Sequence, residues 1–263
     1  MSGQSKFQIR RKLLKALPEA NPPQQELAEW FASALGQRAL ESERLLLAPV
    51  LERLFGYHIL QIGCSEHHSL ISDSPVGHKI IFAPRFYPGV RQAVASNEEL
   101  PLPSDSMDAV LIHHALEFGD SSHKLLREAA RVLRPGGRLM VLGFNPVSAW
   151  GIRKLFSRHT EVPWRARFIA NHRVTDWLRL LDHYVESTAF AGHYLPLNYA
   201  GLLKRADNWE RFGIKLNLPF GGIYFVLSTK QVAPLTPVVP RWRPLRTPAT
   251  ALPATENVRA RIH

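Results

Sequence analysis

The clearest pattern in this chain is a pair of short apolar runs that enclose one amphipathic segment. Residues 109–112 are wholly apolar, which predicts a strand buried on both faces. Apolar residues recur at helical spacing over residues 121–133, and Pro135-Gly136-Gly137 is expected to end that helix. Residues 138–143 form the second apolar run. Strand, crossover helix and strand predict a parallel unit and an α/β fold, with any ligand at the carboxyl ends of the strands.

The same patterns place the remaining elements. Four further apolar runs predict strands, at residues 58–63, 79–83, 184–190 and 222–227. Upstream, apolar residues at helical spacing predict two amphipathic helices that end at Gly36 and Gly56. Residues 7–17 predict a short basic helix. It is either a frayed terminal helix or an arm for a membrane surface or nucleic acid.

These elements suggest three parts. Residues 1–56 are expected to form an N-terminal helical extension, and residues 57–230 an α/β domain with a basic insertion at about residues 146–183. Residues 231–263 are rich in proline and arginine, which predicts a disordered or extended tail.

Composition fits a globular protein with a sizeable core. The chain has 263 residues, of which 45% are hydrophobic and 21% charged. No apolar run is long enough to predict a transmembrane helix, and the first 20 residues lack the apolar core of a secretory signal. Cys64 is the single cysteine, so no internal disulfide is expected. Together these features predict a cytoplasmic protein.

The formal net charge of +11 is unevenly distributed. Residues 1–20 carry +4, residues 151–229 carry +5 and residues 230–263 carry +5, whereas residues 21–150 carry −3. The basic flanks could attract RNA, another anionic molecule or an acidic membrane surface. The alternative is that they only increase solubility and nonspecific attraction.

Two stretches of the sequence resemble a known family. They are A-S-N-E-E-L-P-L-P-S-D-S-M-D-A-V-L-I-H-H-A-L-E-F and L-R-E-A-A-R-V-L-R-P-G-G-R-L. They resemble the second half of a type 11 class I S-adenosylmethionine-dependent methyltransferase domain, in which L-P-F precedes a strand that starts Phe-Asp. The stretch G-F-N-P-V-S-A-W-G is similar to one in an uncharacterised proteobacterial methyltransferase-like group. The resemblance implies a three-layer, doubly wound and mostly parallel seven-stranded sheet.

The resemblance also implies S-adenosylmethionine as cofactor and a set of cofactor-binding positions. These are Gln61, Gly63, Cys64 and Ser65 after the first strand, Ser96, Asn97 and Glu98 before the fourth, and His113 at its end. The sequence departs from the family here. Gln61 stands at the acidic position, and Ser65 and His67 stand at the later glycine positions. Phe82, Ala83 and Pro84 lie where the family has a carboxylate that binds the ribose. Glu66 is a candidate substitute for that carboxylate, against the simpler interpretation of a solvated surface charge.

His113 and His114 follow the central strand, and His67 and His68 follow the neighbouring first strand. Adjacent strand residues point to opposite faces, so at most one residue of each pair is expected to face one site. His114 is the candidate general base, with Glu117 as a residue that could orient an imidazole. Hydrogen-bonded histidines without a chemical role are the alternative. No metal site is predicted, because the histidines lack a ligand framework of recognised spacing.

Basic and aromatic residues alternate after the fifth strand. Such residues can clamp phosphates and stack on bases, so they form the candidate substrate-binding region. The alternative is that the aromatic side chains pack inward while the arginines extend to solvent. Asn145, just before this region, is expected to cap a helix. The candidate substrate-binding residues are Arg153, Lys154, Arg158, Trp164, Arg165 and Arg167.

The leading hypothesis is therefore methyl transfer from S-adenosylmethionine to an unidentified oxygen, nitrogen or carbon acceptor. Alignment of donor and acceptor supplies most of such catalysis, and a base is needed only when the acceptor must lose a proton. The acceptor could be RNA, an anionic small molecule or a lipid-linked compound. The alternative is a catalytically inactive binding or scaffold protein that keeps the fold. A nicotinamide-dependent oxidoreductase is disfavoured, because Gly63 lacks the companion glycines of that motif.

Overall fold

A single seven-stranded sheet forms the centre of the protein. The computed structural model describes residues 22–63, 68–83, 93–94, 99–119, 121–157, 162–197 and 207–231. The strand order is β3-β2-β1-β4-β5-β7-β6. Only the pairings of β7 with β5 and β6 are antiparallel, which confirms the predicted mostly parallel, doubly wound fold.

The strands lie close to their predicted positions. Their bounds are β1 His58–Ile62, β2 His78–Ala83, β3 Ala93–Val94, β4 Met107–His113, β5 Leu133–Phe144, β6 His183–Ala191 and β7 Ile223–Lys230. Ile62 pairs with Ile112, and His113 pairs with Leu142, so β1, β4 and β5 end at one edge. Phe144 at the end of β5 pairs with the first residue of β7. We call this the carboxyl edge of the sheet.

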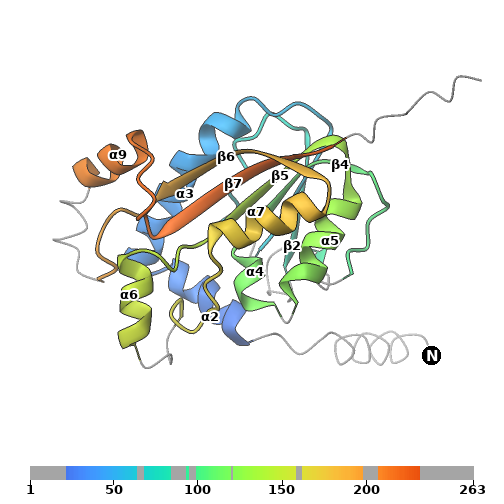
Figure 1. The fold of residues 1–263 in the computed structure, drawn as a ribbon. Coiled ribbons are helices and arrows are strands. Elements are labelled where there is room, and N and C mark those ends of the chain that lie inside the picture. The colour runs from blue at the N-terminus through green and yellow to red at the C-terminus, as the bar shows by residue number, and fades with distance from the viewer. Residues whose placement is uncertain are drawn as a thin grey trace, which may run out of the picture. The chain divides into compact units, whose positions relative to one another are not determined.

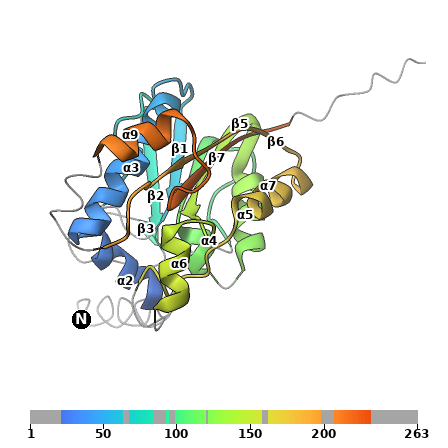
Figure 2. The ribbon, with the colours of Figure 1, turned by 60° about the vertical axis from the view of Figure 1, so that its left-hand side comes forward.

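Helices cover both faces of the sheet (Figures 1 and 2). Their bounds are α2 Pro22–Phe31, α3 Ala34–Leu51, α4 Ala115–Phe118, α5 Ser122–Val132, α6 Ala149–Phe156, α7 Asn171–Leu180 and α9 Asp207–Lys215. Residues of α2 and α3 share a buried cluster with one face of the sheet, and residues of α5 and α7 share a second cluster with the other face. None of the helices within the described ranges is long and apolar enough to cross a bilayer.

Three local expectations were wrong. Gly36 does not end a helix but lies in the first turn of α3, where a Cβ would clash with the Trp30 carbonyl. The helix before Pro135 ends at Val132, and the Pro-Gly-Gly turn forms an irregularity inside β5, with Gly136 at φ +78°. Ser148, not Asn145, caps α6. The Asn145 amide instead donates to the carbonyls of Pro219 and Gly221, 2.9 Å away in both cases.

Contacts divide the chain into two compact units, Met1–Val232 and Ala233–His263. All described residues belong to the first unit. The predicted basic helix at residues 7–17 and the tail from residue 232 onward lie outside the described residues. The proposed domain boundaries therefore stay predictions.

Candidate functional site

Two buried histidines meet at the carboxyl end of β4. His113 is the last residue of β4, and His114 follows with a left-handed backbone at φ +54°. This reversal brings both rings to the same side, with ring centroids 5.0 Å apart. The expectation that only one of the two could face a given site was wrong, because strand alternation ends where the backbone turns.

Glu43 of α3 joins the two imidazoles. Its Oε2 lies 2.9 Å from His113 Nε2, and its Oε1 lies 2.8 Å from His114 Nε2. All three side chains are fully buried. Sequence reasoning missed Glu43, although a signal was present. Glu43 continues the spacing of Leu35, Ala39 and Leu46 on the buried face of an amphipathic helix, where a carboxylate needs a partner.

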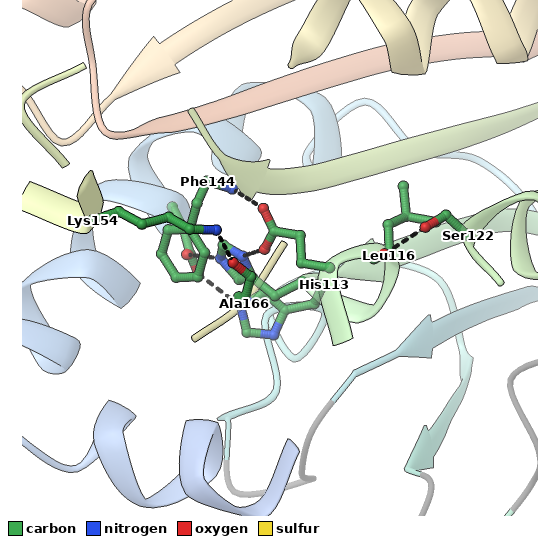
Figure 3. Close-up of polar contacts among 9 residues, drawn as sticks. His113, Leu116, Ser122, Phe144, Lys154 and Ala166 are labelled. Carbon is green, nitrogen blue, oxygen red and sulfur yellow. Dashed lines mark hydrogen bonds and ion pairs between the residues drawn. The ribbon is translucent and has the colours of Figure 1, made fainter. Parts of the chain in front are cut away.

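Glu117 completes the array from the opposite side of His114. Its Oε2 lies 2.9 Å from His114 Nδ1, and its Oε1 accepts a 2.5 Å hydrogen bond from the Phe144 backbone N–H at the end of β5. The Phe144 ring stacks on His114 with centroids 4.0 Å apart. Figure 3 shows His113 and Phe144 in this cluster, with Lys154 reaching the Ala166 carbonyl beside it. The suggested orienting contact between Glu117 and a histidine is thus present.

Burial and pairing give these groups different charges. Burial raises the pKa of Glu43, but the two imidazoles outweigh it and lower the pKa to about 2. Burial lowers the pKa of His114, but Glu43 and Glu117 outweigh it and raise the pKa to about 9. For His113 burial dominates over Glu43, and the net pKa is lowered. Burial likewise raises the pKa of Glu117, against the opposing effect of His114.

A neutral His113 has one ring nitrogen without a proton. Glu43 is ionised and can only accept hydrogen bonds, so His113 Nε2 carries the proton and Nδ1 keeps its lone pair. Nδ1 is buried and has no hydrogen-bond partner among the described residues. Phe31 of α2 stacks on the ring, with centroids 5.2 Å apart and planes inclined by 27°. The Glu43–His113 pair is therefore a carboxylate-oriented imidazole with an available acceptor atom.

That acceptor lies beside Gly63, at the end of β1. A Cβ added to Gly63 would lie 3.5 Å from His113 Nδ1, which is an ordinary contact, and Gly63 does not have a positive φ. Among the described residues, neither packing nor backbone conformation therefore requires glycine here. A bare backbone next to an unsatisfied acceptor fits a site where a polar ligand approaches the chain.

Gln61 has a structural contact pattern. Its Nε2 donates to the His68 carbonyl at 3.1 Å, and its Oε1 accepts from the Leu70 N–H at 2.9 Å, so it fixes both sides of the loop after β1. Phe82 at the end of β2 is buried in the core cluster of the α5 face. The predicted cofactor residues Cys64, Ser65, Ser96, Asn97 and Glu98, as well as Glu66 and His67, lie outside the described residues.

The basic region after β5 is largely engaged within the protein. Arg153 donates to the Pro196 carbonyl and lies 5.0 Å from the Trp164 ring centroid, and Trp164 itself is buried. Lys154 donates to the Ala166 carbonyl and lies 4.6 Å from the Phe168 ring centroid.

Two more basic residues of this region also have partners. Arg165 pairs with Glu26 at 3.2 Å, and Arg167 donates to the Ser122 hydroxyl at 2.8 Å. Arg158 lies outside the described residues. Trp164 packs inward as the packing alternative expects, but Arg153 and Lys154 are half-buried instead of extending to solvent. Substrate binding by this region stays a prediction.

Glu43, His113 and His114 also form a set of donor atoms that lie within 4.8 Å of one another and could in principle hold a metal ion. Each carboxylate oxygen, however, lies at hydrogen-bond distance from a different Nε2. A cation at normal coordination distances of about 2.0–2.2 Å would have to displace both of these protons. The observed geometry is that of a hydrogen-bonded array.

Comparison with known proteins identifies the family. Residues 73–141 match the type 11 family of methyltransferase domains. YafS of Escherichia coli K12, described as an uncharacterized protein, is 32% identical over 209 residues, which covers 77% of this chain and 79% of YafS. The chain belongs to the YafS family. This member therefore carries a type 11 methyltransferase domain, as the sequence predicted.

A more distant match reaches an enzyme with a named activity. The ubiquinone/menaquinone biosynthesis C-methyltransferase UbiE of Vibrio cholerae is 36% identical over 84 residues, which is 31% of this chain and 32% of UbiE. The match leaves two thirds of UbiE unaligned, so it does not give the YafS family an acceptor.

Solved structures show the same fold. A possible histamine N-methyltransferase of Thermotoga maritima has a TM-score of 0.58 at 21% identity and covers 78% of this chain and 94% of its own. A methyltransferase of Archaeoglobus fulgidus has a TM-score of 0.52 at 17% identity, covering 74% of this chain and 95% of its own. The [4+2]-cyclase SpnF scores 0.51 at 17% identity, covering 73% of this chain and 82% of its own. The fold alone therefore does not specify the chemistry.

Proposed function

We propose that this member of the YafS family binds S-adenosylmethionine at the carboxyl edge of β1 and β4 and transfers its methyl group to an acceptor. The observation that carries the proposal is the Nδ1 of His113, which has no hydrogen-bond partner in the part of the chain that the structure describes and is held by Glu43 beside the bare backbone of Gly63. The methyltransferase domain and the class I fold support this choice of cofactor.

The described residues fit the cofactor at its amino-acid end. His113 Nδ1 can accept a hydrogen bond from an ammonium group, and Gly63 leaves the backbone open to a ligand. When bound, the cofactor supplies an electrophilic methyl group on a sulfonium. This chain contributes orientation through a neutral, buried hydrogen-bond acceptor.

Within this proposal His113, not His114, faces the cofactor, and its one lone pair accepts the hydrogen bond from the ammonium group. Glu43 and Glu117 engage both ring nitrogens of His114, and its raised pKa of about 9 keeps it protonated at neutral pH. The lowered pKa of His113 leaves its ring neutral. That His114 acts as a general base stays a prediction, and its contacts do not favour that role.

Calorimetric titration tests cofactor binding without knowledge of the acceptor. We expect S-adenosylmethionine and its demethylated product to bind with dissociation constants between about 1 µM and 1 mM. His113→Gln should weaken binding about tenfold, which corresponds to one hydrogen bond with a charged group. His123→Gln on the exposed face of α5 is the matched control.

Absence of heat with either ligand at millimolar concentration, in a protein that melts cooperatively, would overturn the enzyme proposal and favour the inactive scaffold. Equal affinity of wild type and His113→Gln would leave a cofactor site but remove His113 from it.

A further inference from the structure

Helix α9 exposes two large aromatic side chains, whereas its Ile214 packs against the core. Trp209 and Phe212 of α9 and Leu216 just beyond its end, spaced by three and four residues, form an exposed stripe in which Trp209 is 70% exposed. The opposite face holds Glu210, which is buried and accepts hydrogen bonds from the backbone N–H groups of Gly192 and His193 at 2.8 and 2.6 Å. This buried carboxylate fixes the orientation of the helix, so α9 cannot roll its stripe inward without leaving Glu210 unpaired.

Helix α6 also exposes apolar side chains, although its Trp150 is fully buried in the core. Ile152, Leu155 and Phe156 are exposed, and Phe156 reaches 84%. The cationic Arg153 and Lys154 turn inward and donate to the carbonyls of Pro196 and Ala166. Soluble proteins normally bury the apolar side chains of a helix and expose its charges, so an exposed apolar stripe with inward-turned cations indicates a surface with a partner.

The two stripes are connected by the chain that follows β6. Residues 192–197 contact α9 through Glu210 and α6 through Arg153, and Leu195 between these contacts is exposed. Both helices lie at the left-hand end of the sheet in Figure 1. We call the α6 stripe, the α9 stripe and Leu195 the outer apolar face.

The outer apolar face lies at the carboxyl edge. Helix α6 follows the end of β5, residues 192–197 follow the end of β6, and α9 precedes the start of β7, which pairs with Phe144. His113 and Gly63 lie at the same edge. An occupant of this face would therefore lie at the same edge of the sheet as the candidate site.

Charge and composition select the occupant. Arg211 and Lys215 are exposed and lie beside the α9 stripe, whereas Glu210 is buried. Tryptophan, phenylalanine and leucine flanked by cations are typical of segments that sit in the interface of an acidic bilayer. Residues 151–229 also carry a net charge of +5. We propose that the outer apolar face docks this protein on the surface of a membrane that contains anionic lipids.

This docking suggests a class of acceptor for the transferase. A site that opens beside a membrane surface can receive an apolar, lipid-soluble molecule without its passage through water. The inference about the acceptor rests on the proposed function, whereas the docking itself does not.

Vesicle flotation tests the docking with the full chain and without cofactor. We expect the protein to float with phosphatidylcholine vesicles that contain phosphatidylglycerol, and to bind pure phosphatidylcholine much less. The double variant Trp209→Ser/Phe212→Ser should reduce partitioning to the anionic vesicles at least tenfold, because two aromatic side chains no longer leave water. Phe156→Ser, on the other helix, should reduce partitioning severalfold.

Two exposed apolar residues at the opposite edge serve as controls. Phe55, before β1, is 86% exposed and Leu180, at the end of α7, is 81% exposed. Phe55→Ser and Leu180→Ser should leave vesicle binding unchanged. Because all of these side chains are exposed, thermal unfolding should be similar in every variant.

Three results would overturn the proposal. The first is no flotation of the wild type with anionic vesicles. The second is flotation that Trp209→Ser/Phe212→Ser and Phe156→Ser both leave intact, which would assign binding to another basic part of the chain. The third is a dimer in light scattering that Trp209→Ser/Phe212→Ser dissociates, which would make a second copy the occupant. None of these results bears on cofactor binding, so a failure here remains distinguishable from a failure of the transferase proposal.

Discussion

At the scale of single residues, Glu43 sets the charges of two neighbouring imidazoles. Each of its oxygens accepts a hydrogen bond from a different ring. The second nitrogen of His114 is engaged by Glu117, and the second nitrogen of His113 has no partner among the described residues. A single buried carboxylate can therefore hold one ring as a cation and orient the other as a neutral acceptor.

The stability of the protein should depend on pH through this array. The folded pKa of His114, about 9, lies above the ordinary value of 6.5. Its contribution is fully present below pH 6.5 and is lost as the pH rises through 9. The shift corresponds to about 3 kcal/mol of unfolding free energy. The lowered pKa of Glu43 describes the same pairing from the other side, so the two shifts are not added.

Urea unfolding at pH 6.5 and pH 9.5 measures this loss. His193 changes in the same direction, because burial lowers its pKa but Glu210 and the Leu218 carbonyl outweigh burial and raise it, so the comparison must be made between variants. Glu43→Gln should remove most of the pH dependence, since a neutral amide cannot hold His114 as a cation. Glu41→Gln, which affects only an exposed pair with Arg38, is the control and should behave like the wild type. Identical pH profiles for Glu43→Gln and wild type would contradict the assignment.

At the scale of elements, the residues by which the sequence resembles the family have mostly structural roles. Asp108 Oδ2 accepts hydrogen bonds from the N–H groups of Tyr57 and His58 at 2.7 and 2.8 Å, which fixes the start of β1 beside β4. Arg134 pairs with the other oxygen of Asp108. Arg131 pairs with Glu128 and donates to the carbonyl of Leu100 at 3.0 Å. These contacts pin the approach to β4 onto α5.

Asp108→Ala should therefore destabilise the fold. Two backbone donors lose their acceptor at once, and we expect the free energy of unfolding to fall by about 2–4 kcal/mol. Chemical denaturation gives the measurement. Asp176→Ala, which removes an exposed pair with Arg179 on α7, should change stability by less than about 1 kcal/mol. A small effect at Asp108 would mean that water satisfies these two N–H groups.

The sequence predicted elements well where one periodicity dominates and poorly where tertiary contacts decide. The apolar run of β4 and the apolar spacing of α5 indicated their type and place, and Ser121 caps α5. The left-handed turn at His114 could not be read from its neighbours, because a residue with a Cβ adopts it only under tertiary constraint. Glu43 was missed because its partners lie far along the chain. The glycine loop suggested a cofactor site, but it did not indicate that α3 would supply its central carboxylate.

At the scale of the whole molecule, helices α2 and α3 belong to the main core. Leu27 and Phe31 of α2 and Leu47 of α3 share a buried cluster with Ile59 and Leu111 of the sheet. The predicted N-terminal extension is therefore packed against the α/β domain in the described residues. Removing it would expose one face of the sheet together with the histidine pair.

A chain that starts at residue 57 should not fold on its own. Loss of the α2 and α3 contacts leaves large apolar side chains and two imidazoles without cover, so we expect aggregation or a loss of cooperative thermal unfolding. A truncation after Val232, at the boundary between the two compact units, is the control and should keep a cooperative transition. Circular dichroism on heating compares the two. A cooperative transition in the shorter fragment would show that the α/β part is an independent domain.

The position of Glu43 also bears on how the protein is made. Glu43 precedes His113 by 70 residues, so it leaves the ribosome well before either of its partners exists. A carboxylate is costly to bury alone, so α3 should remain hydrated until β4 has emerged and its histidines are in place. Helix α3, although made before the sheet, would then be among the last elements to settle. Molecular chaperones that recognise nascent apolar segments would have a long opportunity at this helix.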